Sequence, residues 1–263
     1  MFAVSTLGCP GLPLPQVGAL LRRHGVGALQ LRCAADEPVH VGLNAAARSG
    51  VRRDLRAAGL TLIGLATYVR LADGAPGLTE HLRLAQDLGA PALRLMPGGP
   101  DPLRTGPMSP VPADVFDRAA EALADAAARA AGSGVRLLVE THDAFLRGAD
   151  LRRLLEAAAV RPPAVGAIWD AMHPWRAGET PAETVAALAP WLAEIQIKDA
   201  ASAEDRTPLV PGTGAVPGRE VLDLARAAGY AGPVVLEHEA RWYPDAAPID
   251  DAIDGALALL TRG

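Results

Sequence analysis

The chain has 263 residues, half of them apolar, and a formal net charge of −5. This composition can supply a sizeable core, and the mild negative charge disfavours sequence-independent binding to nucleic acid. The two cysteines, Cys9 and Cys33, form no C-x-x-C pair, which argues for a reducing compartment and against a disulfide framework or a structural zinc site.

The N-terminal segment lacks a basic region followed by a long apolar stretch, so it does not resemble a secretory signal. Charged residues interrupt the alanine-rich segments, and no membrane span is predicted. We therefore expect a cytoplasmic protein that has neither membrane nor nucleic-acid partners. The sequence leaves the oligomeric state open, and a homo-oligomer is one of the alternatives.

Short apolar runs alternate with longer amphipathic segments along the whole chain. The apolar runs predict eight strands, at residues 2–7, 28–33, 62–68, 92–96, 136–140, 166–170, 194–198 and 234–237. The amphipathic segments predict eight helices, at residues 15–24, 45–58, 79–88, 112–131, 149–159, 181–192, 218–228 and 249–261. Glycine follows several of these helices, as in "AAGL" and "DLGAP", where a left-handed residue can close the last turn.

Eight strand–helix units in this length predict a parallel sheet closed into an α/β (β/α)8 TIM barrel, a single domain over residues 1–263. A doubly wound open sheet is the alternative. It would favour a phosphate-binding loop after the first strand, but "GCPGLP" is not G-x-G-x-x-G, and its prolines lack amide donors. In a barrel, the active site lies at the C-terminal ends of the strands.

Polar side chains end four of the predicted strands. Glu140 ends the fifth strand, Asp170 the sixth and Glu237 the eighth, while Gln196 lies near the end of the seventh. Buried carboxylates are costly without a cation or hydrogen bonds, so their convergence predicts one divalent metal. Oxygen ligands suit Mn²⁺ or Mg²⁺, and a nearby imidazole keeps Co²⁺ and Zn²⁺ open. For each carboxylate alone, capping of the next helix is the alternative.

The seventh strand carries the only lysine of the chain. Side chains alternate along a strand, so Glu194, Gln196 and Lys198 share one face, and Ile195 and Ile197 share the other. The two isoleucines are expected in the apolar layer between the barrel and the helices. Glu194, Gln196 and Lys198 would then point into the barrel. A compact ammonium can approach a substrate oxygen where a planar guanidinium cannot, although a single lysine can also survive by chance.

Five motifs together resemble the xylose isomerase-like TIM-barrel superfamily, in particular its sugar phosphate isomerase and epimerase family, over nearly the full chain. These motifs are "LLVETHD", "IWDAMHPW", "IQIKDA", "PGTGAVPG" and "VVLEHEARWYP". The resemblance implies a single divalent metal held by Glu140, Asp170, Gln196 and Glu237. Many members carry histidine in place of Gln196; the glutamine is more similar to the hydroxypyruvate isomerase pattern and leaves the substrate open.

The resemblance also implies a reaction. A metal that chelates a carbonyl and the adjacent hydroxyl of a sugar or keto-sugar acidifies the intervening C–H, and Glu140 and Glu237 would move that proton as an acid/base pair. His173 and Lys198 are expected to hold substrate oxygens. Arg32 could reach a distal hydroxyl, carboxylate or phosphate, with a salt bridge at the rim as its alternative. His142 shares the face of Glu140 and is either a substrate contact or a packed core residue.

Other functions of this superfamily remain as alternatives. An inosose-type dehydratase or lyase would use the same metal, and a sugar-binding barrel would use the same pocket without catalysis. AP endonucleases of the superfamily hold a zinc cluster through additional histidines. None of the six histidines of this chain ends the third or fourth strand, so we expect an isomerase or epimerase instead.

Overall fold

Eight parallel strands form a closed barrel in the computed structural model, which describes residues 1–104 and 108–261. Each strand pairs with the next along the chain, and β1 closes the barrel against β8. The predicted (β/α)8 barrel is thereby confirmed. The strands are β1 (Phe2–Ser5), β2 (Ala28–Arg32), β3 (Thr61–Arg70), β4 (Ala92–Met96), β5 (Arg136–Glu140), β6 (Val165–Asp170), β7 (Leu192–Ile197) and β8 (Val234–Leu236).

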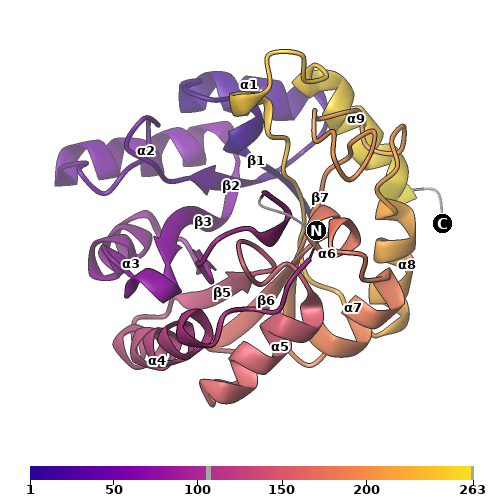
Figure 1. The fold of residues 1–263 in the computed structure, drawn as a ribbon. Coiled ribbons are helices and arrows are strands. Elements are labelled where there is room, and N and C mark those ends of the chain that lie inside the picture. Colours follow the sequence, from indigo (N-terminus) through magenta and orange to yellow (C-terminus); the bar gives the residue numbers. More distant parts are fainter. Residues whose placement is uncertain (105–107, 262–263) are drawn as a thin grey trace.

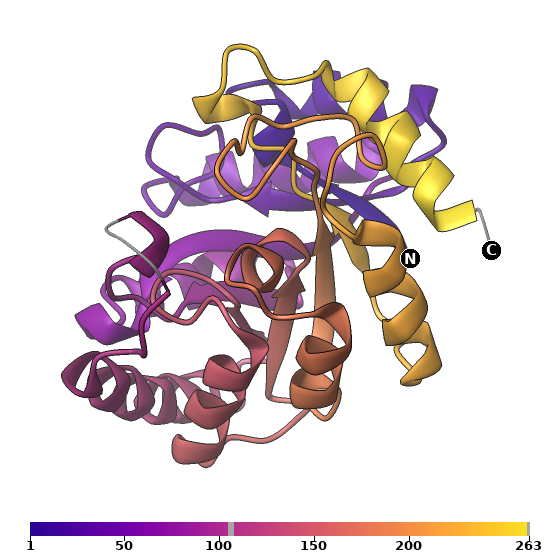
Figure 2. The same cartoon turned by 45° about the vertical axis from the view of Figure 1, so that its right-hand side comes forward.

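The helices form a ring around the strands (Figure 1). They are α1 (Leu14–Arg23), α2 (Ala45–Ala58), α3 (Leu78–Leu88), α4 (Ala113–Ala130), α5 (Gly148–Ala157), α6 (Met172–Arg176), α7 (Pro181–Leu188), α8 (Gly218–Ala227) and α9 (Ile249–Thr261). Short 3-10 turns lie at Thr6–Gly8, Leu71–Asp73, Pro102–Arg104 and Ala240–Trp242. Figure 2 shows the last helix, α9, lying near α8 on one side of the barrel. None of the helices within the described residues combines the length and the hydropathy that a membrane span needs.

Local sequence signals start and stop these helices. Gly59 and Gly89 close α2 and α3 in the left-handed conformation, with φ of 67° and 75°, as the glycine pattern predicts. Thr180 and Glu183 form a capping box at the start of α7, and Pro181 occupies its first position. The ends of the helices are thus fixed by their own residues as well as by packing.

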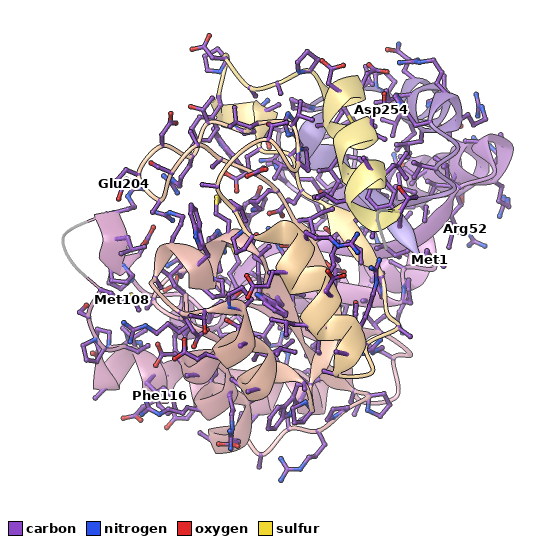
Figure 3. All side chains as sticks on the ribbon, turned by 90° about the vertical axis from the view of Figure 1, so that its right-hand side faces the viewer. Met1, Arg52, Met108, Phe116, Glu204 and Asp254 are labelled. Atoms are coloured by element: carbon purple, nitrogen blue, oxygen red, sulfur yellow. The ribbon has the colours of Figure 1, made fainter. Side chains whose placement is uncertain are left out.

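The apolar core lies mainly between the strands and the helix ring. Trp169, Ile195 and Ile197 belong to this layer, as strand alternation predicts. Inside the barrel, two small apolar clusters remain, formed by Ala92, Leu138, Ile168 and Ala193 and by Ala3, Ala28 and Val235. Buried polar residues of the strands share the interior with these clusters, so the barrel supports a polar site at one end. Figure 3 shows Glu204, in the loop after β7, on the opposite side from Met1, which precedes β1.

Most predicted bounds shift by one or two residues, so that β7 ends just before Lys198 and β8 just before Glu237. Three further differences have a local cause. The helix predicted to end at residue 192 ends at Leu188, because the Trp191 carbonyl accepts a hydrogen bond from the Ala167 amide and Leu192 begins β7. β1 ends at Ser5 instead of residue 7, where a 3-10 turn follows. The short helix α6 was not predicted, since five residues are too few for a helical period to show.

Candidate active site at the barrel mouth

Three carboxylates from separate strands converge inside the mouth of the barrel. Glu140 and Asp170 are the last residues of β5 and β6, and Glu237 directly follows β8. All three are buried, and one oxygen of each lies within 4.8 Å of the others. The barrel topology brings together residues that are almost 100 positions apart in the sequence.

Gln196 on β7 is in register with Asp170, so its amide lies on the strand next to this group. Its Nε2 donates to Glu194 Oε1 at 3.1 Å, whereas its buried Oε1 has no hydrogen-bond partner within the described part of the chain. Within the same described residues, both oxygens of Glu140 and Oδ2 of Asp170 are also buried without a hydrogen bond, although cationic side chains form ion pairs with Glu140 Oε2 and Asp170 Oδ2. A divalent cation would be an ordinary partner for such a set of oxygens, so these residues fit a metal site.

Two cationic side chains also lie among the carboxylates. Arg94 on β4 places Nη1 at 2.9 Å from Glu237 Oε1 and 3.1 Å from Glu140 Oε2. Lys198, which follows β7, places Nζ at 2.7 Å from Asp170 Oδ2 and in close contact with Glu237. The carboxylate group is therefore partly neutralised by residues of the chain itself.

Sequence reasoning missed Arg94 and Glu239. Arg94 interrupts the apolar run "ALRLM", and a charged residue at an inward position of a strand was the signal that could have found it. Glu239 lies two residues after Glu237 and pairs with Lys198 Nζ at 2.8 Å. The only signal for Glu239 in "EHEARW" was its distance of two residues from Glu237. Strand alternation does not extend to it, because β8 ends at Leu236.

The environment pulls the pKa values of these groups apart. Burial raises the pKa of Glu140 to about 7, and Arg94 offsets only part of this effect. Burial would also raise the pKa of Glu237, but the neighbouring Lys198 and Arg94 outweigh it and lower its pKa. Burial opposes the charge of Lys198, yet Asp170, Glu237 and Glu239 raise its pKa well above the ordinary value. Glu237 and Lys198 are therefore charged in this arrangement.

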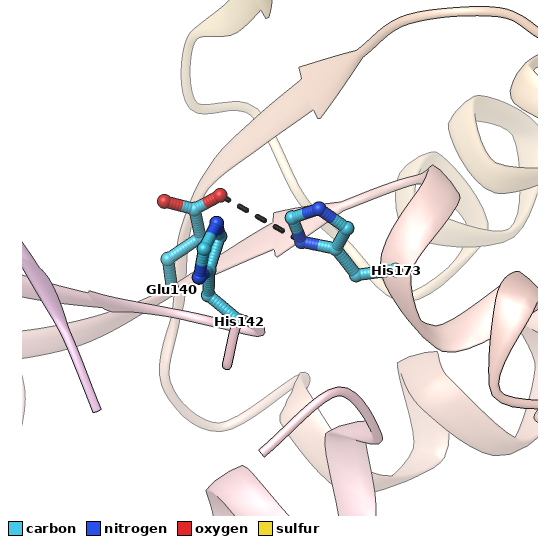
Figure 4. A group of neighbouring side chains, drawn as sticks. All are labelled: Glu140, His142 and His173. Atoms are coloured by element: carbon cyan, nitrogen blue, oxygen red, sulfur yellow. Dashed lines mark ion pairs between the residues drawn. The ribbon is translucent and has the colours of Figure 1, made fainter. Parts of the chain in front are cut away.

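Two histidines flank Glu140 (Figure 4). His173, on α6, places Nδ1 at 3.8 Å from Glu140 Oε1 and at 2.6 Å from the Thr141 carbonyl oxygen. The rings of His142 and His173 meet edge to face with centroids 4.8 Å apart. These three residues form a second group whose ligand atoms are close enough for a metal ion, sharing Glu140 with the first. Burial, His142 and Lys198 hold the pKa of His173 well below its usual value, so its ring is neutral.

Arg32 lies at the rim, where carboxylates already occupy its guanidinium. Nη1 pairs with Glu37 at 2.5 Å and with Asp36 at 3.0 Å, and Nε donates to the Tyr68 hydroxyl at 2.7 Å. The salt bridge that was its alternative role is present. Contact with a substrate remains a prediction for Arg32.

The "PGTGAVPG" motif folds around a buried aspartate. Asp199 accepts hydrogen bonds from the amides of Gly212, Gly214 and Val216 at 2.7–3.1 Å. A Cβ on Gly214 would come within 2.4 Å of the Ala200 carbonyl oxygen, so this position requires glycine. The motif thus fixes the loop that directly follows Lys198.

The closed barrel and the carboxylates at the ends of its strands define a TIM barrel with a polar site at its mouth. The model of the xylose isomerase-like TIM barrel family matches residues 19–261, and the chain belongs to this family. The resemblance inferred from the motifs is confirmed at this level. A search of the curated proteins gives no match.

Solved structures share the fold over the whole chain. An IOLI protein with a bound zinc atom has a TM-score of 0.81 at 13% identity, covering 99% of this chain and 98% of that chain. A protein described as the probable 3-DHS dehydratase AsbF, from Bacillus anthracis, has a TM-score of 0.77 at 16% identity, covering 100% and 99%. An L-ribulose 3-epimerase has a TM-score of 0.75 at 15% identity, covering 98% and 92%. At identities of 13–16%, the similarity establishes a shared fold and does not extend to a shared activity.

Proposed function

We propose that the protein is a divalent-metal-dependent isomerase or epimerase of a sugar or small keto-sugar. The observation that carries this proposal is the convergence of Glu140, Asp170 and Glu237. Gln196 lies in register with Asp170 and has a buried oxygen without a hydrogen bond among the described residues. These four residues would hold the metal, with Mn²⁺ or Mg²⁺ favoured by the oxygen ligands and Co²⁺ or Zn²⁺ as alternatives. The zinc in the IOLI structure supports a divalent metal at this site, and the epimerase among the similar folds supports the class of reaction.

The bound metal would polarise the substrate carbonyl and stabilise the enediolate that follows proton removal. Glu237 is ionised, since Lys198 and Arg94 lower its pKa, and its carboxylate can accept the proton of the carbon next to the carbonyl. Glu140 lies three strands away around the barrel, so it can exchange a proton with the opposite face of the same carbon. Which of the two glutamates acts first depends on the stereochemistry of the substrate.

The remaining mouth residues would orient the substrate. His173 is neutral and its Nδ1 donates to the Thr141 carbonyl oxygen, which leaves Nε2 as an acceptor for a substrate hydroxyl. The Lys198 ammonium lies beside Asp170 and Glu237, the proposed metal ligands. From there it would donate to an oxygen of a substrate bound at the metal. His142 and Arg32 are proposed as further contacts, toward Glu140 and at the rim respectively.

Proton exchange with solvent tests this proposal. Metal-loaded protein should incorporate deuterium from deuterated water next to the carbonyl of an accepted ketose, from a panel that includes L-ribulose. Glu237→Gln should lower the exchange rate by about 10²–10⁴-fold or more, since acid/base groups contribute this much and the residue would also bind metal. Mass spectrometry of the ketose measures the exchange.

The same experiment separates the alternatives. Loss of 18 mass units from the substrate would indicate a dehydratase, which the AsbF fold makes a reasonable second candidate. Binding of ketoses without deuterium uptake would indicate a sugar-binding barrel. An unchanged exchange rate in Glu237→Gln would remove this residue from the reaction.

A further inference from the structure

The single lysine of the chain lies in a cage of carboxylates. Lys198 directly follows β7, and its side chain is 4% exposed. Its Nζ lies 2.7 Å from Asp170 Oδ2 and 2.8 Å from Glu239 Oε1, and it also contacts Glu237 Oε2. Three carboxylates from two neighbouring regions thus surround one ammonium.

Two of these three carboxylates belong to the proposed metal site. A divalent ion held by Asp170 and Glu237 would draw on the same carboxylates that Nζ contacts. Two cations that share the same oxygens repel each other strongly at such short range, particularly in a buried site. The ammonium and the metal therefore compete for Asp170 and Glu237.

The third carboxylate gives the ammonium an alternative position. Glu239 is not among the residues that converge for a metal, and its side chain is 17% exposed, compared with 0% for Asp170 and 3% for Glu237. The lysine stem is flexible, so Nζ can leave Asp170 and Glu237 while it keeps its ion pair with Glu239. Arg94 has no such freedom, since its Nε and Nη2 both donate to the Thr67 carbonyl oxygen.

We propose that Lys198 is a built-in counter-cation of the metal site, which competes with the divalent ion for Asp170 and Glu237 and moves to Glu239 when the ion binds. The inference rests on the proposed metal site and adds a residue that sets its affinity. It also gives a reason for lysine at this position. A mobile ammonium on an unbranched stem can give way to the ion, whereas a guanidinium anchored like that of Arg94 would stay between the carboxylates.

Binding of Mn²⁺ alone tests the competition. Protein depleted of metal is titrated with Mn²⁺, and free Mn²⁺ is measured by electron paramagnetic resonance. Lys198→Met should bind Mn²⁺ at least about tenfold more tightly than the wild type, because a competing charge has been removed from the ligands. Arg206→Met is the matched control: Arg206 is a half-buried cation in the loop after β7, with no ion pair within the described residues, and its removal should change the affinity by about twofold or less.

A double-mutant cycle examines the role of Glu239. Glu239→Gln removes the alternative partner of the ammonium, so it should weaken Mn²⁺ binding more in the wild-type background than in Lys198→Met. A simple loss of negative charge would weaken binding equally in both backgrounds. The thermal midpoint gives a second readout: without metal, Lys198→Met should melt below the wild type, and saturating Mn²⁺ should narrow the difference.

The outcomes distinguish the inference from the proposed function. Equal or weaker Mn²⁺ binding by Lys198→Met than by Arg206→Met would overturn the competition and leave the metal site standing. Failure of Mn²⁺ to bind to the wild type and to both variants would overturn the metal site, and the competition with it. If Lys198→Met does not fold, Lys198→Gln replaces it both in the titration and in the double-mutant cycle with Glu239→Gln.

Discussion

Arg94 shows how one side chain holds the interior of the barrel together. Its guanidinium joins Glu140 and Glu237, the two proposed acid/base residues, and is itself fixed by the Thr67 carbonyl oxygen on the neighbouring strand β3. Removing one partner of a buried ion pair leaves an uncompensated charge, which destabilises a protein by about 3–5 kcal/mol. The stability of the mouth should therefore depend on this one residue.

Arg94→Met should lower the thermal midpoint by roughly 6–20 °C, since each kcal/mol corresponds to about 2–4 °C in a chain of this size. Calorimetry measures the shift. Arg94→Lys keeps the charge but loses the paired bonds to Thr67, so its loss should be smaller. In the double variant Arg94→Met/Glu140→Gln one carboxylate is neutral, and part of the stability should return. A variant Arg94→Met as stable as the wild type would show that the ion pairs contribute nothing.

At the scale of elements, a histidine joins the first helix to the last. His24, just after α1, contacts Asp250 and Asp254 of α9 at 2.8 and 2.7 Å, and Arg23 also pairs with Asp250. The hydrogen bond to Asp250 is the largest influence and raises the pKa of His24 above its usual 6.5, with Asp254 adding to the effect. The contribution of the charged imidazole to stability is therefore fully present below pH 6.5 and lost as the pH rises through the raised pKa.

His24→Gln should be less stable than the wild type at pH 5.5, and the difference should shrink toward pH 9. Ion pairs with exposed partners contribute about 0.2–1 kcal/mol, so the expected difference in midpoint at low pH is roughly 0.4–4 °C. Arg23→Gln is the control, because arginine stays charged and its difference from the wild type should not change between these pH values. A constant difference for His24→Gln would contradict the raised pKa.

At the scale of the molecule, closure of the barrel ties the two ends of the chain together. β1 pairs with β8, and the C-terminal helix α9 buries Ala252, Ile253 and Ala256 completely. Distant parts of a closed barrel share one core, so we expect residues 1–263 to unfold as one unit.

Ile253→Ala should lower a single unfolding transition by about 4–20 °C, since truncation of a buried isoleucine costs about 2–5 kcal/mol. Tryptophan fluorescence, which includes Trp169 buried on β6, and far-ultraviolet circular dichroism should report the same midpoint. An early loss of helix signal while the fluorescence transition stays in place would mean that α9 unfolds separately and that the chain is not one cooperative domain.

The sequence by itself determined the order of the strands and of all the longer helices, because the spacing of apolar residues and the glycines that end helices are local signals. It also placed Glu140, Asp170, Gln196 and Glu237 at the C-terminal ends of strands, where a closed barrel must bring them together. The inward direction of Gln196 followed from alternation with the isoleucines of β7. These features depend on residues within one element and on the topology that the alternation of elements imposes.

Only the tertiary structure decided which charges neutralise which. The ion pairs of Arg94 with Glu140 and Glu237, and of Lys198 with Asp170 and Glu239, join residues on or just after different strands, up to 143 positions apart. Arg32 likewise meets Glu37 through the turn after β2, which no period in the sequence specifies. Electrostatic energy depends on distances of a few ångströms and on exclusion of water, and both are set only when the strands close around the site.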